Sequence, residues 1–209
     1  HHAITNICEP TFENFSIYHN YACRSGKGLH KAIEQAQQFQ KRYGYFLKLD
    51  IRKYFESINH DTLLNLLAKR FDDEKLLTLF EKIIRSGGLN GKGLPIGNLT
   101  SQHFANFYLG HLDHYLKDFL GIKGYVRYMD DFVIWTNSKE ELQEIRNRVE
   151  QFCREKLQLE LKTVEERLAP VDFGLPFLGF RIFPSRIRMK QSTKKRFKKK
   201  VLNYHKMVF

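Results

Sequence analysis

The sequence of 209 residues contains only three cysteines and no apolar run that approaches the length of a membrane span. Cys8, Cys23 and Cys153 are dispersed along the chain, without the spacing of a zinc site. Such a set predicts reduced thiols in a cytosolic protein and not a disulfide framework. No leader with a charged start and an apolar core opens the sequence, so we expect no membrane association.

Acidic residues are missing from positions 186–206, which hold ten of the lysines and arginines. The net charge of +12 is therefore uneven, with only +2 left for the rest of the chain. Such a run is often a solvated tail. Here apolar residues interrupt it at helical spacing, which predicts a helix with one basic face suited to a phosphate backbone. These residues are Phe197, Val201, Leu202 and Tyr204.

The remaining pattern predicts a packed α+β protein, with 42% hydrophobic and 14% aromatic residues. We expect strands over 45–50, 125–129 and 132–135, short strands or a turn over 159–169, and a hairpin of 177–183 with 186–190. We expect helices over 1–18, 28–43, from Asn59 or Asp61 to about 70, from Asp72 or Asp73 to about 85, from Thr100 or Ser101 to about 120, over 138–156, and from Ser192 or Thr193 onward. This order predicts a ferredoxin-like antiparallel sheet with helices on one face.

Aspartates follow two of the expected strands. Asp50 ends the strand 45–50, and Asp130 with Asp131 separates the strands 125–129 and 132–135. Adjacent aspartates between strands are usually an ordinary hairpin turn, because Asp tolerates the positive φ of such turns. If the strands are neighbours in one sheet, however, the carboxylates converge at one edge. Like charges that close favour a divalent cation, and Mg²⁺ prefers such oxygen ligands.

Four motifs together resemble the reverse transcriptases. Tyr-Met-Asp-Asp at 128–131 is similar to their palm signature, and Asp-Ile-Arg-Lys-Tyr-Phe at 50–55 to their first catalytic motif. The segment 93–102 resembles their template- and nucleotide-contacting loop, and Phe-Leu-Gly-Phe at 177–180 their primer-gripping turn. Within the family, the Ile-Gly-x-x-x-Ser-Gln form of 96–102 resembles the enzymes of diversity-generating retroelements. Group II intron enzymes usually carry Gln-Gly and Ser-Pro at these places.

The resemblance implies a polymerase that transfers nucleotides with two Mg²⁺ ions, for which Mn²⁺ is a possible substitute. Asp50 and Asp130 would be the main metal ligands, Asp131 would be less direct, and the Ile51 carbonyl would complete one shell. Lys162 is a candidate general acid for the leaving pyrophosphate; a solvated surface lysine is the rival interpretation.

Further residues would contact the incoming nucleotide. The backbone amides of Lys53 and Tyr54 would face the triphosphate. Phe55 stands where relatives carry an aromatic that blocks a 2′-hydroxyl, although a core phenylalanine is the alternative. Gly97 would let the backbone approach the base pair, and Ile96, which offers no hydrogen bond, would leave selection to shape. Gln102 and Met129 complete this set.

The primer and template would contact a third group of residues. Arg24 and Lys27 lie in a basic turn that either binds phosphate or simply begins a helix. The other expected contacts are Tyr128, Phe177, Leu178 and Gly179 in the palm, and Lys198 and Lys199 in the basic helix.

The implied architecture is a right-hand polymerase palm. Residues 1–43 would be partial fingers, 44–190 the palm with inserted fingers helices, and 191–209 the start of a thumb. The implied partners are an RNA template, a DNA or RNA primer, deoxynucleotides and a basic accessory protein, in the cytoplasm of a bacterium or phage. A group II intron-like enzyme and a non-catalytic RNA-binding module are the alternatives.

Overall fold

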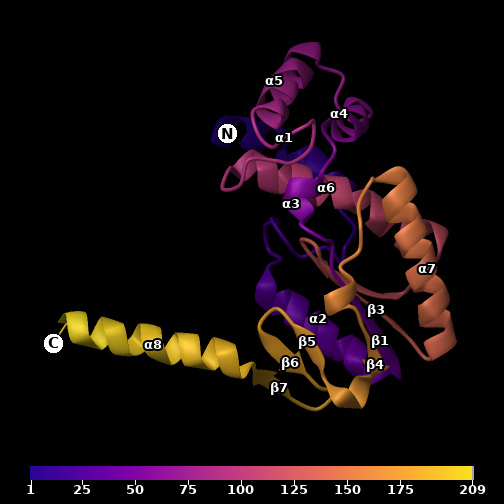
Figure 1. The fold of residues 1–209 in the computed structure, drawn as a ribbon, viewed down its shortest axis with the longest axis vertical. Coiled ribbons are helices and arrows are strands. Elements are labelled where there is room, and N and C mark those ends of the chain that lie inside the picture. The colour runs from indigo at the N-terminus through magenta and orange to yellow at the C-terminus, as the bar shows by residue number, and fades with distance from the viewer. Residues whose placement is uncertain (209) are drawn as a thin grey trace.

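The computed structural model describes residues 1–208, without the side chains of residues 165, 192, 203 and 205–208. Its centre is a four-stranded antiparallel sheet in the order β2-β3-β1-β4 (Figure 1). The strands are β1 (Tyr45–Leu49), β2 (Gly124–Tyr128), β3 (Asp131–Thr136) and β4 (Arg167–Pro170). All its pairings are antiparallel, which confirms the sheet type predicted from the sequence.

The sheet is covered on both of its faces. Side chains alternate along each strand, so Leu47 and Ile134 enter one core while Phe46 and Trp135 enter another. The first core contains the helices α6 (Leu99–His114) and α7 (Lys139–Lys156). The second contains α2 (Leu29–Arg42) and a small second sheet, where helices on one face only were expected. The sequence did not indicate this because α2 precedes the first strand of the sheet.

The second sheet comprises β5 (Leu175–Phe177), β6 (Phe180–Ile182) and β7 (Ile187–Met189). The predicted hairpin around Pro184-Ser185 joins β6 to β7. A second, tighter hairpin joins β5 to β6 through Leu178 and Gly179, at φ of 47° and 85°. Two-residue hairpins favour such positive φ values, because the turn then matches the twist of the strands. The expected strand 177–183 is therefore two strands.

The predicted helix caps are confirmed at three of the four places tested by the structure. The side chains of Asn59, Asp73 and Ser138 accept hydrogen bonds from the amides that open the next helix. The remaining N-terminal helices are α1 (His2–Phe15), α3 (Tyr54–Ser57), α4 (His60–Ala68) and α5 (Glu74–Arg85).

The fourth helix start differs from the prediction. The N-cap of α6 is Asn98, and Thr100 and Ser101 are buried inside its first turn. The helix was predicted to run to about residue 120. In the structure α6 ends at His114, and a π-helical turn, η1 (Tyr115–Phe119), continues from it.

The chain between α7 and β4 is mostly irregular. Leu161 forms an isolated antiparallel bridge with Ile51, followed by a 3₁₀ turn, η2 (Thr163–Glu165). Another 3₁₀ turn, η3 (Val171–Phe173), leads from β4 to the second sheet.

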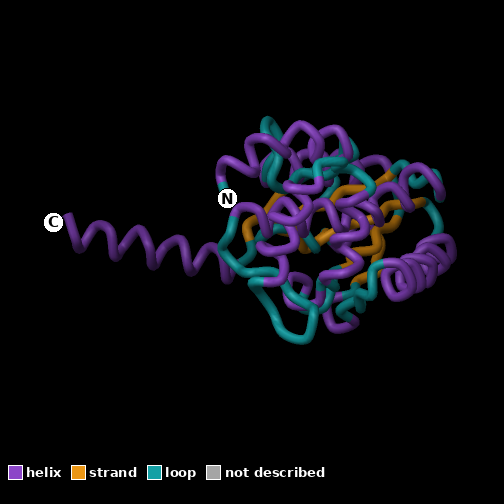
Figure 2. The backbone as a smooth tube through the Cα atoms, turned by 90° about the horizontal axis from the view of Figure 1, so that it is seen from above, coloured by secondary structure: helices purple, strands orange, loops and turns teal. Residues whose placement is uncertain are grey.

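The last helix, α8 (Gln191–Val208), projects away from the body (Figures 1 and 2). Its existence confirms the helix predicted for the basic run. Among the helices of residues 1–208, we find none that is both long and apolar enough to cross a membrane.

Candidate active site

The ends of two neighbouring strands bring the aspartates together. Leu49 pairs with Phe132, so the register carries Asp50, the next residue, to a position beside Asp131. Asp50 and Asp130 line one open cleft of about 940 Å³. The structure thus brings together the two main ligands predicted from the sequence.

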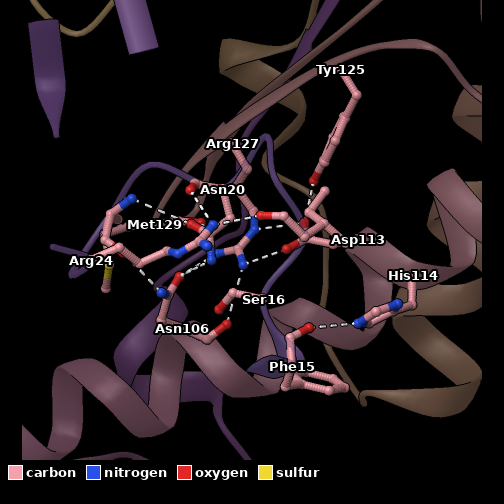
Figure 3. A network of polar contacts seen from close by, with 12 residues as sticks. Phe15, Ser16, Asn20, Arg24, Asn106, Asp113, His114, Tyr125, Arg127 and Met129 are labelled. Atoms are coloured by element: carbon pink, nitrogen blue, oxygen red, sulfur yellow. Dashed lines mark hydrogen bonds and ion pairs between the residues drawn. The ribbon is translucent and has the colours of Figure 1, made fainter. Parts of the chain in front are cut away.

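The β2–β3 turn consists of Met129 and Asp130, since Tyr128 pairs with Asp131. The residue at positive φ is Met129, at 56°, whereas an aspartate was expected there. A left-handed conformation is unfavourable for a residue with a long side chain, and surrounding contacts must hold it. One such contact is visible in Figure 3, where Arg127 Nη1 donates a 2.9 Å hydrogen bond to the Met129 carbonyl.

Arg127 belongs to a buried network between β2 and α6 (Figure 3). Its guanidinium binds Asp113 through Nε at 2.7 Å and Nη2 at 2.6 Å, and both side chains have no exposed surface. Tyr125 donates to the same carboxylate, and Asn106 Oδ1 accepts from Arg127 Nη1 at 2.8 Å. Although burial disfavours the charged guanidinium, the Asp113 carboxylate raises the pKa of Arg127. The turn that carries Asp130 is therefore tied to the core.

Asp131 has a partner that the sequence analysis missed. Lys48 Nζ lies 2.9 Å from Asp131 Oδ1, and the Lys48 side chain is only 8% exposed. Burial raises the pKa of Asp131 to about 6, and the Lys48 ammonium opposes that rise. Burial also raises the pKa of Asp130. The available signal was a single lysine in an otherwise apolar strand.

The aspartates fit a divalent cation only in part. Among the described side chains, no group of three or more His, Cys, Asp or Glu residues is arranged to hold a metal. Asp131 is paired with Lys48, whereas Asp50 and Asp130 line the cleft, together with the carboxylates of Glu150 and Glu160. Burial destabilises the charged form of Asp130, and a hard cation would offset this cost. Ile51 lines the same cleft.

Lys162 lies along the same cleft as Asp50. The segment 160–162 runs antiparallel to 50–52, because Lys162 N donates to the Asp50 carbonyl and Arg52 N to the Glu160 carbonyl, both at 2.9 Å. The ammonium of Lys162 also opposes the rise in the pKa of Asp130. Its expected position near the carboxylates is thus met, while its role stays a prediction.

The residues expected to contact the triphosphate follow β1. Lys53 and Tyr54 line the cleft, and the Tyr54 hydroxyl is buried where it donates to the Ala105 carbonyl. Phe55 is half-buried against the main core, and its carbonyl accepts a hydrogen bond from Leu94 N. This contact joins the loop before α6 to the start of α3.

Residues 96 and 97 of the loop before α6 are open to solvent. Ile96 is 79% exposed, and Gly97 adopts φ of 96°, where an added Cβ would meet no atom within 4 Å. Gln102 and Met129 are brought together by Cys23, whose Sγ lies 3.7 Å from Gln102 Oε1 and 3.8 Å from Met129 Sδ. Gln102 of α6 and Met129 of the β2–β3 turn therefore lie close together on one side of the site.

Two of the expected primer and template contacts have little or no exposed side-chain surface. Arg24 binds Glu13 and the carbonyls of Ile17 and Asn20, and its side chain is 8% exposed, so it holds the loop in place. Phe177 is fully buried in the second core and has no surface for a primer.

The other expected contacts remain accessible to different degrees. Lys27 Nζ donates to the Tyr18 carbonyl and lies 3.4 Å from the Tyr18 ring centre. Burial lowers the pKa of Lys27. Tyr128 and Leu178 are half-buried against the second core, and Gly179 is half-buried beside them. Lys198 and Lys199 are exposed on α8.

The three cysteines are free thiols. Cys8 and Cys153 are buried, and Cys23 is half-buried.

Solved structures of similar fold come from telomerases. Apo telomerase from Candida tropicalis matches 91% of this chain with a TM-score of 0.71 at 10% identity, over 41% of its own chain. A form truncated from the C-terminal domain gives a TM-score of 0.72 at 12% identity, covering 90% of this chain and 45% of its own. At such identities the similarity concerns the fold, and it supports the α+β palm with fingers helices.

Sequence comparisons identify the family. The family model described as reverse transcriptase (RNA-dependent DNA polymerase) matches residues 2–182. The group II intron-encoded protein LtrA of Lactococcus lactis is 25% identical, covering 96% of this chain and 44% of its own length. Protein YkfC of Escherichia coli is 24% identical, covering 89% of this chain and 60% of its own length. The chain thus corresponds to only a part of these relatives, and over that part it belongs to the reverse transcriptase (RNA-dependent DNA polymerase) family.

Proposed function

We propose that the protein is an RNA-directed DNA polymerase that adds deoxynucleotides to the 3′-hydroxyl of a primer. The observation that carries this proposal is the placement of Asp50 and Asp130 in one open cleft, at the ends of adjacent strands of a chain from this family. These carboxylates would hold Mg²⁺ or Mn²⁺, with the Ile51 carbonyl as a further ligand. The metals would supply charge neutralisation for phosphoryl transfer.

The chain's own residues would position the reacting groups around that cleft. The backbone at Lys53 and Tyr54 lines it and is suited to a triphosphate. Lys162 also lines the cleft, on the segment that runs beside residues 50–52, where it would protonate the leaving pyrophosphate. Phe55 and Gly97 would shape the pocket for sugar and base.

The proposed partners are an RNA template, a DNA or RNA primer and deoxynucleotides. Exposed lysines of α8 support a nucleic-acid duplex as a partner. Two telomerases of similar fold were solved with a fragment of telomeric RNA, the one from Candida albicans with a TM-score of 0.62.

Two subtypes compete. The Ile96-Gly97 start and Ser-Gln end of the loop favour a diversity-generating enzyme, for which a basic accessory protein is a further proposed partner. The match of the intron-encoded LtrA over 96% of this chain favours the alternative, a group II intron-like enzyme. Loose copying concentrated at template adenines would distinguish the first from the second.

The test is primer extension by the full-length protein on an RNA template with Mg²⁺ or Mn²⁺. Asp50→Asn and Asp130→Asn should each abolish extension and leave the circular dichroism spectrum unchanged. Asp172→Asn, at an exposed position outside the cleft, is the matched control and should retain full activity. RNA binding without extension by the wild-type protein would instead support the non-catalytic RNA-binding module.

A further inference from the structure

Lys48 is a buried cation in the middle of β1. It follows the buried residues Phe46 and Leu47, and its side chain is 8% exposed. Removing a lysine ammonium from water costs several kcal/mol unless a partner compensates it. A lysine at this position therefore needs a negatively charged partner. Which residue serves as that partner indicates the role of Lys48.

The counter-charge is Asp131. The two charged atoms lie 2.9 Å apart, and the Asp131 side chain is 22% exposed. Lys48 pairs with Val133 across β1 and β3, so its side chain lies on the sheet face that also carries Asp131. Extending this register places Asp50 on the same face, one step further along. The groups around Asp131 are thus Lys48 from β1, Asp50 after β1, and Asp130 in the turn.

The adjacent aspartates Asp130 and Asp131 differ because of this pair. Asp130 lines the cleft, whereas the Asp131 carboxylate is paired with Lys48. Three carboxylates at one sheet edge repel one another, and the charges of Asp50 and Asp130 both act on Asp131. Lys48 is the protein's own cation that compensates Asp131.

We infer that Lys48 is a positioning residue that retains Asp131 beside β1, so that Asp50 and Asp130 form the metal-facing pair. This inference rests on the proposed function, because it assigns roles within the same metal site. Loss of Lys48 releases Asp131 as a third carboxylate toward the cleft. Divalent cations then bind more tightly, while the alignment needed for nucleotide transfer is lost.

The experiment compares Lys48→Met, Asp131→Asn and the double variant with the wild-type full-length protein. Binding of Mn²⁺ is measured by electron paramagnetic resonance of the free ion, and separately by the rise in melting temperature that Mn²⁺ produces. Primer extension gives kcat and the KM for deoxynucleotide. We expect Lys48→Met to bind Mn²⁺ about tenfold more tightly, the scale on which residues behind metal ligands act, and to lose kcat with little change in KM.

The double variant shows whether Lys48 acts through Asp131. In the Asp131→Asn background, Lys48→Met should change Mn²⁺ affinity by less than about twofold, because no carboxylate remains to be released. An equal effect in both backgrounds would show that Lys48 acts only as a general positive charge and would overturn the inference. Unchanged Mn²⁺ affinity in Lys48→Met would overturn it as well.

Two controls keep the result interpretable. Lys48→Arg preserves the charge and should stay near the wild type in Mn²⁺ affinity. Should Lys48→Met not fold, Lys48→Gln replaces it, since its amide can donate to Asp131 without a charge. If Asp50→Asn leaves Mn²⁺ binding intact, the metal site of the proposed function is wrong, and this outcome is distinct from a failure of the Lys48 inference.

Discussion

Two regions of the molecule differ in whether their charged side chains are buried or exposed. At the end of the main sheet that carries Asp50, Asp130 and Asp131, charged side chains behind the candidate site are buried and paired, as in Arg127 with Asp113. In the proposed contact elements, which are the loop 86–98 and helix α8, Ile96 and most of the described α8 side chains are exposed. Buried residues of the main core hold the first region in place, so substitutions there also affect the stability of the fold. Exposed positions such as Ile96 and Lys198 can be substituted with little cost in folding, so changes there should separate stability from contact.

The largest effect should follow from Arg127→Met. This change leaves Asp113 as a buried charge without its partner, which costs about 3–5 kcal/mol. We expect a lower melting temperature, and loss of primer extension at temperatures where the variant is still folded, because the Met129 carbonyl loses its donor. The double variant Arg127→Met with Asp113→Leu should recover much of the stability but not the activity. Recovery of both would mean that the network only stabilises the core.

A smaller effect is expected from Asp131→Asn. The fold should persist, and primer extension should fall by about 10–100-fold, the range for residues that act behind metal ligands. Primer extension should fall further in Asp130→Asn, because this change removes a carboxylate that lines the cleft. Equal losses in the two variants, measured as kcat under saturating Mg²⁺, would contradict the distinction between them.

In the contact elements, replacing Lys198, Lys199 and Lys200 by Gln should weaken template binding without destabilising the protein. On a duplex, each lost phosphate contact flattens the log–log dependence of affinity on salt by about 0.9. Fluorescence anisotropy across a salt series measures this slope, and thermal unfolding serves as the control. An unchanged slope would identify the basic run as a solvated face.

The smallest effects concern nucleotide selection. Ile96→Gln offers one new hydrogen bond, worth about 0.5–1.5 kcal/mol, so misincorporation should fall by up to about tenfold. The decrease should concentrate at template adenines if the protein is of the diversity-generating type. Sequencing of products copied from an adenine-rich RNA measures it, and an unchanged error rate would place fidelity elsewhere.

Phe55 tests the same pocket from the sugar side. Phe55→Ala should admit ribonucleotides at some loss of deoxynucleotide efficiency, because the ring no longer clashes with a 2′-hydroxyl. Competition assays with paired nucleotides give the ratio. Because Phe55 also packs against the core, the melting temperature of the variant must be measured alongside the competition assays.

The sequence predicted what depends on local pattern. Strand ends and caps such as Asn59 and Asp73 follow from neighbouring residues, and the convergence of Asp50 with Asp130 follows once the two strands pair. The pairs Lys48–Asp131 and Arg127–Asp113 could not be predicted, because their partners come together only through tertiary packing. For the same reason the burial of Phe177, which was expected to contact the primer, could not be predicted.

The attachment of α8 has a mechanical consequence. At its base, Lys190 N donates to the Gly179 carbonyl, and a Cβ at position 179 would lie 3.3 Å from the Thr193 hydroxyl. Eighteen helical residues form a rod about 27 Å long at 1.5 Å per residue. A tilt of about 10° at the base therefore moves its far end by about 5 Å, more than the 3.4 Å rise between neighbouring phosphates of one DNA strand. If α8 binds nucleic acid as proposed, the turn at Leu178-Gly179 lies where a small change of angle would alter which phosphates the lysines of the helix reach.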